Sequence, residues 1–213
     1  LAEQIEEKLH QAILGVVPWE KKRAENTNIS TLYFADEHKP FAESVRSLRT
    51  SVILSSLDNP HKVILVTSSL PGEGKTTISS NLALALGQME KVLLIDADMR
   101  RPSLAKEYNL DKYGAGLSEL VAGISNEPEC IKRLEELGID LITSGAVPPN
   151  PLDLLSSKQF EELLHQLKER YDRIIIDSAP TQAVSDSLVL SAKADALIYV
   201  VKSDATPANV AKK

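Results

Sequence analysis

The sequence has little of what builds disulfide-rich, metal-bound or membrane-spanning proteins. Its 213 residues include one cysteine, Cys130, so no internal disulfide can form and a reducing compartment is expected. Four histidines are scattered along the chain without the spacing of a zinc site. No apolar run approaches the roughly 18 residues that a membrane-spanning helix needs, and no signal peptide is recognisable. These absences leave a globular domain as the starting point.

The charge balance argues against nucleic acid as a partner. The chain has 24 Lys and Arg against 30 Asp and Glu, a net charge of −6, whereas nucleic-acid-binding domains are usually basic. The hydrophobic fraction of 43% can build a core, and the 25% of charged residues give a soluble surface. The length fits one large domain, or one domain with an extension.

A glycine-rich segment between an apolar run and a helical pattern is the most informative part of the chain. Residues 68–77 read Ser-Ser-Leu-Pro-Gly-Glu-Gly-Lys-Thr-Thr, after the apolar run 63–66 and before the helical pattern 78–86. Strand, glycine loop and helix in this order form the context of a phosphate-binding loop. Ser69 stands where the usual motif has its first glycine.

The residue types in this loop suit a bound nucleotide. Gly72 and Gly74 allow a close backbone approach, and the freed N–H groups with the helix N-terminus form an anion nest. Lys75 is placed to reach the β- and γ-phosphates, and the Thr76 hydroxyl to hold Mg²⁺. The predicted nucleotide-binding residues are Gly72, Glu73, Gly74, Lys75, Thr76 and Thr77.

Repeated strand and helix patterns predict an α/β fold. Strands are expected at 62–67, 91–96, 139–143, 172–177 and 194–201. Helices are expected at 41–57, 76–89, 117–122, 129–137, 157–170 and 185–192. Several of the strands are continuous apolar runs, which is typical of a parallel sheet buried on both faces. The sequence therefore predicts a doubly wound, mostly parallel sheet of the P-loop NTPase type, with helices on both faces and ligands at the carboxyl ends of the strands.

Residues 1–40 are predicted to be an extension of a main domain over 41–213. A short amphipathic helix is expected over 1–12 and a short strand over 14–18. The following stretch, 19–39, is polar and turn-rich.

Aspartates end two of the predicted strands. Asp96 and Asp98 are two residues apart, so on an extended chain they face the same side. Asp177 ends a second apolar run in a Walker B pattern and is expected to hold Mg²⁺ directly or through water. One such aspartate alone is best read as a loop or helix cap. Two acidic strand ends after a phosphate loop favour a metal–phosphate site.

The combination resembles the bacterial tyrosine kinases (BY-kinases), which act in capsule and exopolysaccharide synthesis. The phosphate loop, the hhhhDxDxRRP segment ending at Pro102 and the hhhDxxP segment ending at Pro180 resemble their Walker A, Walker A′ and Walker B elements. Residues 41–50 resemble the family's ExxRxxR helix, and residues 141–155 its SGxxPPNPxxLL segment. The resemblance runs from about Leu14 to the end. It implies a kinase domain that uses ATP and Mg²⁺ to phosphorylate tyrosines between subunits, and that regulates exopolysaccharide synthesis and export.

The resemblance also implies roles for the site residues. Lys75 neutralises the transferred phosphate, and Thr76 coordinates Mg²⁺. Asp96 is the first candidate to accept the tyrosine proton, and Asp98 and Asp177 support the metal. Because a phenol with a pKa near 10 is mostly protonated at pH 7, a positioned carboxylate assists its attack. Whether Asp96 or Asp98 is the base stays open, since both can lie in the metal shell.

Three charged residues on one predicted helix admit two interpretations. Glu43, Arg46 and Arg49 are spaced i, i+3, i+6, and the apolar stripe of this helix is expected elsewhere, so that these side chains point outward. By themselves they indicate a solvated face with a Glu–Arg pair worth about 0.2–0.5 kcal/mol. The resemblance instead implies a surface that docks on a neighbouring subunit to form a ring-like homo-oligomer, for which arginine is well suited.

The resemblance implies further partners and a location. In the family, a transmembrane polysaccharide co-polymerase half is fused or separate, a cognate tyrosine phosphatase acts on the kinase, and the catalytic domain lies at the cytoplasmic face of the bacterial inner membrane. The five tyrosines here do not form the family's C-terminal cluster, the usual self-phosphorylation target. We therefore expect a truncated or partly disordered cytoplasmic catalytic domain.

Two other functions remain open. A ParA/MinD-type ATPase also has acidic strand ends, but it normally carries a lysine five residues before the main one, where this chain has Leu70. A nucleotide-gated assembly module that controls polysaccharide chain length is the second. Lys75→Met discriminates between this module and the kinase. Loss of phosphate transfer alone indicates the kinase, whereas loss of assembly as well indicates the assembly module.

Overall fold

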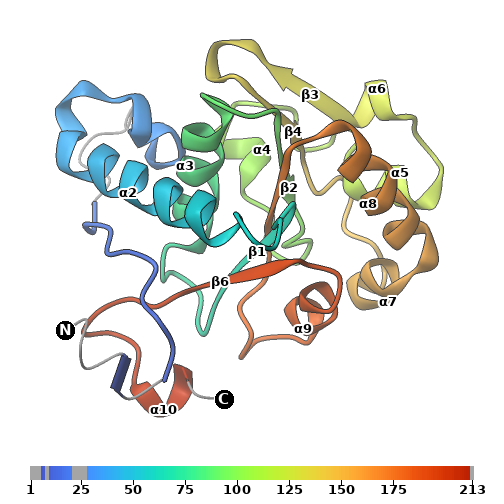
Figure 1. Ribbon diagram of the computed structural model, residues 1–213. Coiled ribbons are helices and arrows are strands. Elements are labelled where there is room, and N and C mark those ends of the chain that lie inside the picture. Colours follow the sequence, from blue (N-terminus) through green and yellow to red (C-terminus); the bar gives the residue numbers. More distant parts are fainter. Residues whose placement is uncertain (1–5, 8–9, 21–27, 212–213) are drawn as a thin grey trace.

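The fold is built around one six-stranded sheet. The computed structural model describes residues 6–7, 10–20 and 28–211 (Figure 1). The strands are β1 (Val63–Ser68), β2 (Val92–Asp96), β3 (Ile131–Leu134), β4 (Ile139–Ile142), β5 (Arg173–Asp177) and β6 (Ala196–Val200). Their order is β3-β4-β2-β5-β1-β6, with β3 antiparallel to β4 and the other pairs parallel. The predicted mostly parallel α/β sheet is confirmed.

Helices and 3₁₀ turns connect these strands. The α-helices are α2 (Lys39–Ser55), α3 (Lys75–Gly87), α4 (Leu104–Glu107), α5 (Leu117–Ala122), α6 (Glu127–Cys130), α7 (Pro151–Ser156), α8 (Lys158–Arg170), α9 (Asp186–Ser191) and α10 (Ala208–Ala211). The 3₁₀ turns are η1 (Ile29–Phe34), η2 (Asp36–His38) and η3 (Glu135–Leu137). No described helix is both long enough and apolar enough to cross a bilayer.

Two hydrophobic cores lie on opposite faces of the sheet. Helices α2 and α3 cover one face, and α5, α7, α8 and α9 lie on the other (Figure 1). Successive residues of β1 alternate between the cores: Ile64 and Val66 pack under α2 and α3, whereas Val63 and Leu65 pack toward α8. This alternation explains why the strand is apolar throughout, since neither of its faces meets water.

The strand order brings the ends of β2, β5 and β1 side by side. Because β5 lies between β1 and β2, Asp177 pairs in register with Asp96 on one side and with Val66 on the other. The glycine loop after β1 and both acidic strand ends therefore meet at one edge of the sheet. Ligands of open α/β sheets bind at this edge.

The predicted helix over 129–137 is wrong. Helix α6 ends at Cys130, and residues 131–134 form β3, an edge strand paired with β4. A spacing of three would place Ile131 and Leu134 on one face of a helix, whereas in the strand they lie on opposite faces and pack on different cores. Antiparallel pairing with β4 makes these residues a strand. The Arg133 guanidinium stabilises the pairing by donating to Asp140 at 3.0 Å.

The N-terminal predictions have mixed outcomes. No strand forms over 14–18; these residues are irregular, and Leu14 and Val17 pack on the core beside α2 and α3 through their side chains. Pro18 has no N–H for a ladder, which disfavours a strand here. The helix predicted over 1–12 lies mostly outside the described residues. The division of the chain at residue 40 stays a prediction.

Part of the stretch predicted to be turn-rich is ordered on the phosphate-loop helix. The Asn81 side chain of α3 accepts from the backbone N–H of Tyr33 at 2.8 Å and donates to the carbonyl of Ile29 at 2.9 Å. One amide thus holds both ends of η1 against α3. The other predicted strands and helices begin and end within two residues of their observed bounds.

Candidate functional site

The loop between β1 and α3 has the backbone of an anion nest. Gly72 and Gly74 have φ angles of +81° and +96°, which favour glycine. A Cβ at Gly72 would meet nothing within 4 Å, so backbone conformation rather than space requires glycine there. Helix α3 begins at Lys75, so the loop N–H groups and the positive end of a 13-residue helix face the same region.

Side chains next to the loop hold its shape. Glu73 is buried, and its carboxylate accepts from the backbone N–H of Leu70 at 2.6 Å and from the Thr206 hydroxyl. The Ser69 hydroxyl, at the position where a glycine is usual, lies 2.9 Å from the Tyr199 hydroxyl. Glu73 and Ser69 therefore brace the loop, and the Glu73 side chain is already engaged within it.

Lys75 and Thr76 meet the carboxylates of two other strand ends. Lys75 Nζ donates to Asp98 Oδ2 at 3.0 Å and lies 3.8 Å from Asp177 Oδ1. Burial lowers the pKa of Lys75, but the Asp177 and Asp98 carboxylates outweigh it and raise the pKa above the ordinary value. Lys75 is therefore a cation at physiological pH. The Thr76 hydroxyl donates to Asp177 Oδ2 at 2.7 Å.

The remaining oxygen of Asp177 fits a cation. Asp177 is fully buried, and its Oδ1 has no hydrogen-bond partner among the described residues. Lys75 Nζ is 3.8 Å from this oxygen, beyond hydrogen-bond distance, so the oxygen still favours a cation that lies closer. A hydroxyl and one or two carboxylates beside a phosphate nest form the ligand set that Mg²⁺ accepts. These residues therefore fit Mg²⁺ held together with a nucleotide.

Asp96 lies deeper and has different partners. It is fully buried; its Oδ2 accepts from the backbone N–H groups of Ser103 and Leu104 at 3.1 and 3.0 Å, and its Oδ1 accepts from Asp98 N–H at 3.2 Å. Burial, followed by the neighbouring Asp177 carboxylate, raises the pKa of Asp96 to about 7, against the opposing effect of the backbone donors. Asp96 thus pins the loop after β2 and titrates near neutral pH.

Comparison with known proteins places this geometry in a family. The model of the AAA domain family matches residues 61–209. The tyrosine-protein kinase YwqD of Bacillus subtilis is 39% identical over 150 residues, 70% of this chain and 63% of that protein. The putative tyrosine-protein kinase CapB of Staphylococcus aureus is 33% identical over 165 residues, 76% of this chain and 72% of that protein. The chain belongs to the bacterial tyrosine kinase family.

A solved structure of a BY-kinase agrees over nearly the whole chain. The kinase domain of the Escherichia coli tyrosine kinase ETK has a TM-score of 0.89 and 31% identity, and the match covers 99% of this chain and 84% of that one. The chain spans 63% of YwqD, but only 22% and 23% of the longer curated BY-kinases of Acinetobacter johnsonii and Escherichia coli.

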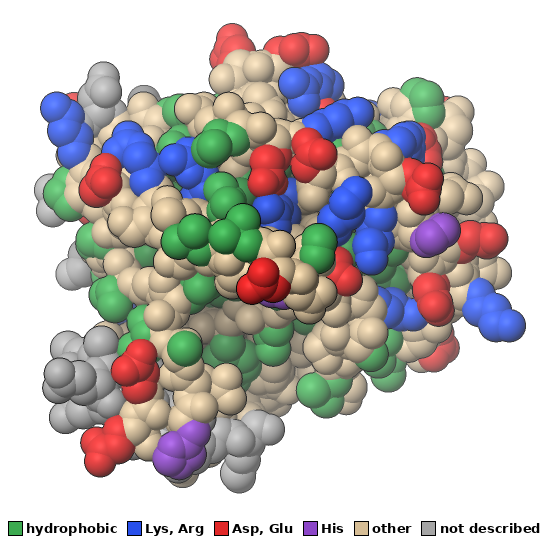
Figure 2. Space-filling model, viewed as in Figure 1, with side chains coloured by type: hydrophobic (Ala, Val, Ile, Leu, Met, Phe, Trp, Pro, Cys, Tyr) green, Lys and Arg blue, Asp and Glu red, His purple; other side chains and the backbone are tan. Residues whose placement is uncertain are grey.

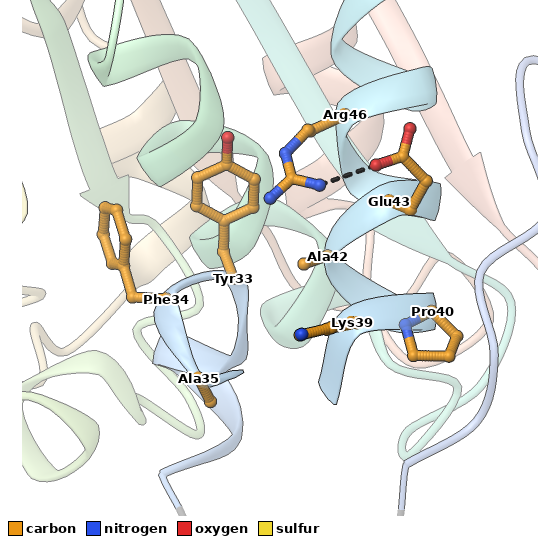
Figure 3. A pocket seen from close by; sticks show the side chains of 8 residues that line it. All are labelled: Tyr33, Phe34, Ala35, Lys39, Pro40, Ala42, Glu43 and Arg46. Carbon is orange, nitrogen blue, oxygen red and sulfur yellow. Dashed lines mark hydrogen bonds and ion pairs between the residues drawn. The ribbon is translucent and has the colours of Figure 1, made fainter. Parts of the chain in front are cut away.

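The ExxRxxR stripe of this BY-kinase is divided between surface and interior. Glu43 and Arg46 form an exposed ion pair of 2.6 Å, and the Arg46 guanidinium lies 5.6 Å from the centre of the Tyr33 ring (Figure 3). Together with Lys39 and Phe34 they line a cavity of about 490 Å³ between η1 and α2. The outward orientation expected for Glu43 and Arg46 is correct.

The outward orientation expected for Arg49 is wrong. Its Nη1 donates to the carbonyl of Ala85 at 3.1 Å and lies 3.5 Å from the Tyr33 hydroxyl, so the side chain turns toward α3. Arg49 follows Val45 by four residues and precedes Val52 by three, which places it beside the buried stripe of α2. That spacing is the sequence signal for its inward orientation.

Sequence reasoning missed one pair near the BY-kinase site. In the structure, Asp186 is fully buried at the start of α9 and receives both arms of the Arg100 guanidinium. Because the two residues are 86 positions apart in the sequence, the pairing becomes apparent only from the three-dimensional structure.

Proposed function

We propose that this domain transfers the γ-phosphoryl group of ATP to tyrosine. The observation that supports it most is the convergence of Lys75, Thr76, Asp98 and Asp177 beside the glycine loop, at the ends of three adjacent strands. Phosphoryl transfer needs alignment and neutralisation of charge more than covalent help from the protein. A preorganised cation, an anion nest and a set of oxygen ligands meet that need.

Each residue of this cluster has a separate task. The N–H groups around Gly72 and Gly74 bind the β- and γ-phosphates, and Lys75 exchanges Asp98 for a phosphate oxygen when ATP enters. Thr76 and Asp177 hold Mg²⁺, with Asp98 supporting them. When bound, Mg²⁺ supplies neutralisation of the charge that develops on the phosphates.

Asp96 is proposed as the acceptor of the tyrosine proton. A carboxyl group whose pKa is about 7 is matched to proton transfer at physiological pH. Its Oδ1 has a single 3.2 Å hydrogen bond and so retains capacity for a phenol O–H. Asp98 is the competing base: its Oδ2 contacts Lys75 at 3.0 Å until ATP enters, and its Oδ1 accepts from the Arg101 N–H at 3.1 Å.

The acceptor tyrosine is proposed to come from a second subunit of a ring-like homo-oligomer. The exposed Glu43–Arg46 pair and the cavity beneath it offer charge and an aromatic surface for such a contact. We further propose that the domain works at the cytoplasmic face of the bacterial inner membrane with a transmembrane polysaccharide co-polymerase half. A cognate tyrosine phosphatase would reverse the reaction, and the cycle would regulate capsule or exopolysaccharide synthesis and export.

Transfer of labelled phosphate tests this proposal. The domain is incubated with γ-labelled ATP, Mg²⁺ and a tyrosine-rich peptide, with Lys75→Met and Asp96→Asn as controls. Label on tyrosine in the wild type and in neither control supports the kinase. Free labelled phosphate without labelled tyrosine would instead indicate an ATPase of the ParA/MinD type. If Lys75→Met also abolished self-association, nucleotide-gated assembly would be the better description.

A further inference from the structure

The buried Asp186 and the partly exposed Arg100 form a two-armed ion pair beside the predicted transfer site. Arg100 Nε donates to Asp186 Oδ2 at 2.9 Å, and its Nη2 donates to Oδ1 at 3.2 Å. Asp186 is fully buried, whereas the side chain of Arg100 is 41% exposed. The roles proposed above for the Walker residues do not account for this pair.

The pair is joined to the site through a tight turn. Arg100 lies in the Asp98–Arg101 turn, where the Arg101 N–H donates to the carbonyl of Asp98 at 3.2 Å and to its Oδ1 at 3.1 Å. The other oxygen of Asp98 receives Lys75. A guanidinium fixed at the third position of this turn therefore restrains the backbone that carries Asp98.

The turn has one anchor on each side. Asp96 holds it from within, by accepting from the N–H groups of Asp98, Ser103 and Leu104. Asp186 holds it from the far side through Arg100. Asp186 is a firm anchor because α9 packs on α7 and on β1, the strand that ends in the glycine loop.

The energetics favour a specific pairing. A buried carboxylate is costly unless it is paired, and a two-armed arginine contact is the strong form of such a pair. Arginine cannot be replaced by lysine here without losing the fork geometry. The pair lies next to the turn that carries Asp98. Its position matters because a displacement of about 1 Å in a catalytic group can reduce a rate about 100-fold.

We propose that Asp186 is a positioning residue for phosphoryl transfer: through Arg100 it fixes the Asp98–Arg101 turn, and with it the position of the Asp98 carboxylate beside the phosphate loop. The inference rests on the proposed kinase function. The proposal assigns Arg100 a contact within the domain, and it makes α9 one of the elements that position the active site.

The test compares Asp186→Asn with a matched control elsewhere. Glu127 of α6 and Arg170 of α8 form the same kind of two-armed pair, with N–O distances of 2.6 and 2.8 Å. Both residues are distant from the phosphate loop in the sequence. Asp186→Asn and Glu127→Gln are assayed for thermal unfolding, ADP affinity, kcat and KM of peptide phosphorylation, and hydrogen exchange of the amides of residues 98–104.

We expect Asp186→Asn to lower kcat about 10- to 100-fold, with ADP affinity and peptide KM within about threefold of wild type. The amides of 98–104 should exchange faster in this variant alone, and Glu127→Gln should match the wild type in kcat. Arg100→Lys keeps the positive charge but loses the two-armed contact, so its kcat should lie between those of wild type and Asp186→Asn. Arg100→Lys also replaces Asp186→Asn in the test if that variant does not fold.

The outcomes separate the two proposals. If the wild type phosphorylates the peptide and Asp186→Asn does so with unchanged kcat and unchanged exchange, the positioning role is overturned. An equal loss of kcat in Glu127→Gln would also overturn it, since the effect would be one of general stability. If the wild type transfers no phosphate to tyrosine, the kinase proposal fails, and the exchange data alone still decide whether Asp186 holds the turn.

Discussion

Lys75 Nζ lies 3.0 Å from Asp98 Oδ2, so the lysine expected to bind phosphate is held by a carboxylate that follows β2, two strands away from β1 in the sheet. The contact is buried and is backed by Asp177 at 3.8 Å. The charged Lys75 side chain is thus already held in the site when no nucleotide is bound. We expect ATP binding to replace Asp98 with a phosphate oxygen as the partner of Lys75.

Lys75→Met should therefore affect stability as well as activity. Removing the cation leaves buried carboxylates without their partner, which costs about 3 kcal/mol in the free energy of unfolding at pH 8. The loss should be smaller at pH 6, where a carboxyl of the cluster takes up a proton. Urea unfolding of the variant and the wild type at both pH values measures this, and an equal loss at pH 6 and pH 8 would contradict it.

The buried Asp96 carboxyl predicts an unusual dependence of stability on pH. Its pKa is raised from 3.8 to about 7 on folding, so between these values the folded state binds more protons than the unfolded state. The free energy of unfolding of the nucleotide-free protein should therefore fall as the pH rises from about 4 to about 7, by at most about 1.4 kcal/mol per pH unit for this group.

Asp96→Asn provides the control for this dependence, because the amide does not titrate in that range. The slope of unfolding free energy against pH should become shallower in Asp96→Asn. Equal slopes in the wild type and in Asp96→Asn between pH 5 and pH 7 would show that Asp96 is ionised well below neutrality, and would remove the physical ground for choosing it as the base.

The two arginines of the ExxRxxR stripe should behave differently. Arg49 donates to a carbonyl in the last turn of α3, where a cation also complements the helix dipole, so Arg49→Met should lower the free energy of unfolding by about 1–2 kcal/mol. Arg46→Met disrupts an exposed, solvent-screened pair and should lower the free energy of unfolding less than Arg49→Met does. Thermal or urea unfolding of the two variants under conditions that keep both monomeric makes the comparison. Equal effects would contradict the inward orientation of Arg49.

Self-association should depend on the exposed part of the stripe. Glu43→Ala combined with Arg46→Ala is expected to give a folded monomer that still binds ADP, because neither side chain touches the phosphate loop. Light scattering and a fluorescent ADP analogue measure the two properties. Variation at the exposed Glu161–Lys193 pair, which bridges α8 and the residues after α9, serves as the surface control. Rings that persist in the double variant would place the interface elsewhere.

Mixed charge covers the rest of the face that carries α2. On the side seen in Figure 2, acidic and basic side chains are interspersed, and apolar side chains are grouped between them. The predicted interface therefore depends on the Glu43–Arg46 pair and the cavity beside it.

The sequence could predict the site because its signals are local. The glycine loop follows a strand and begins a helix, and Asp96 and Asp177 each end an apolar run, so strand ends and site residues were predictable together. What could not be predicted depends on tertiary neighbours. Residues 131–134 fit a helix or a strand until β4 supplies a partner. The partner of Asp186 is 86 residues away, and no local pattern encodes it.

Transfer between two different chains tests the central claim most directly. A Lys75→Met chain extended by a tyrosine-rich tail is mixed with the wild-type domain, γ-labelled ATP and Mg²⁺, and the label on each chain is counted after separation by size. We predict label on tyrosines of the larger chain, lost when the smaller chain carries Asp98→Asn or Lys75→Met. Label recovered only as free phosphate, with the tail unmodified, would contradict the account.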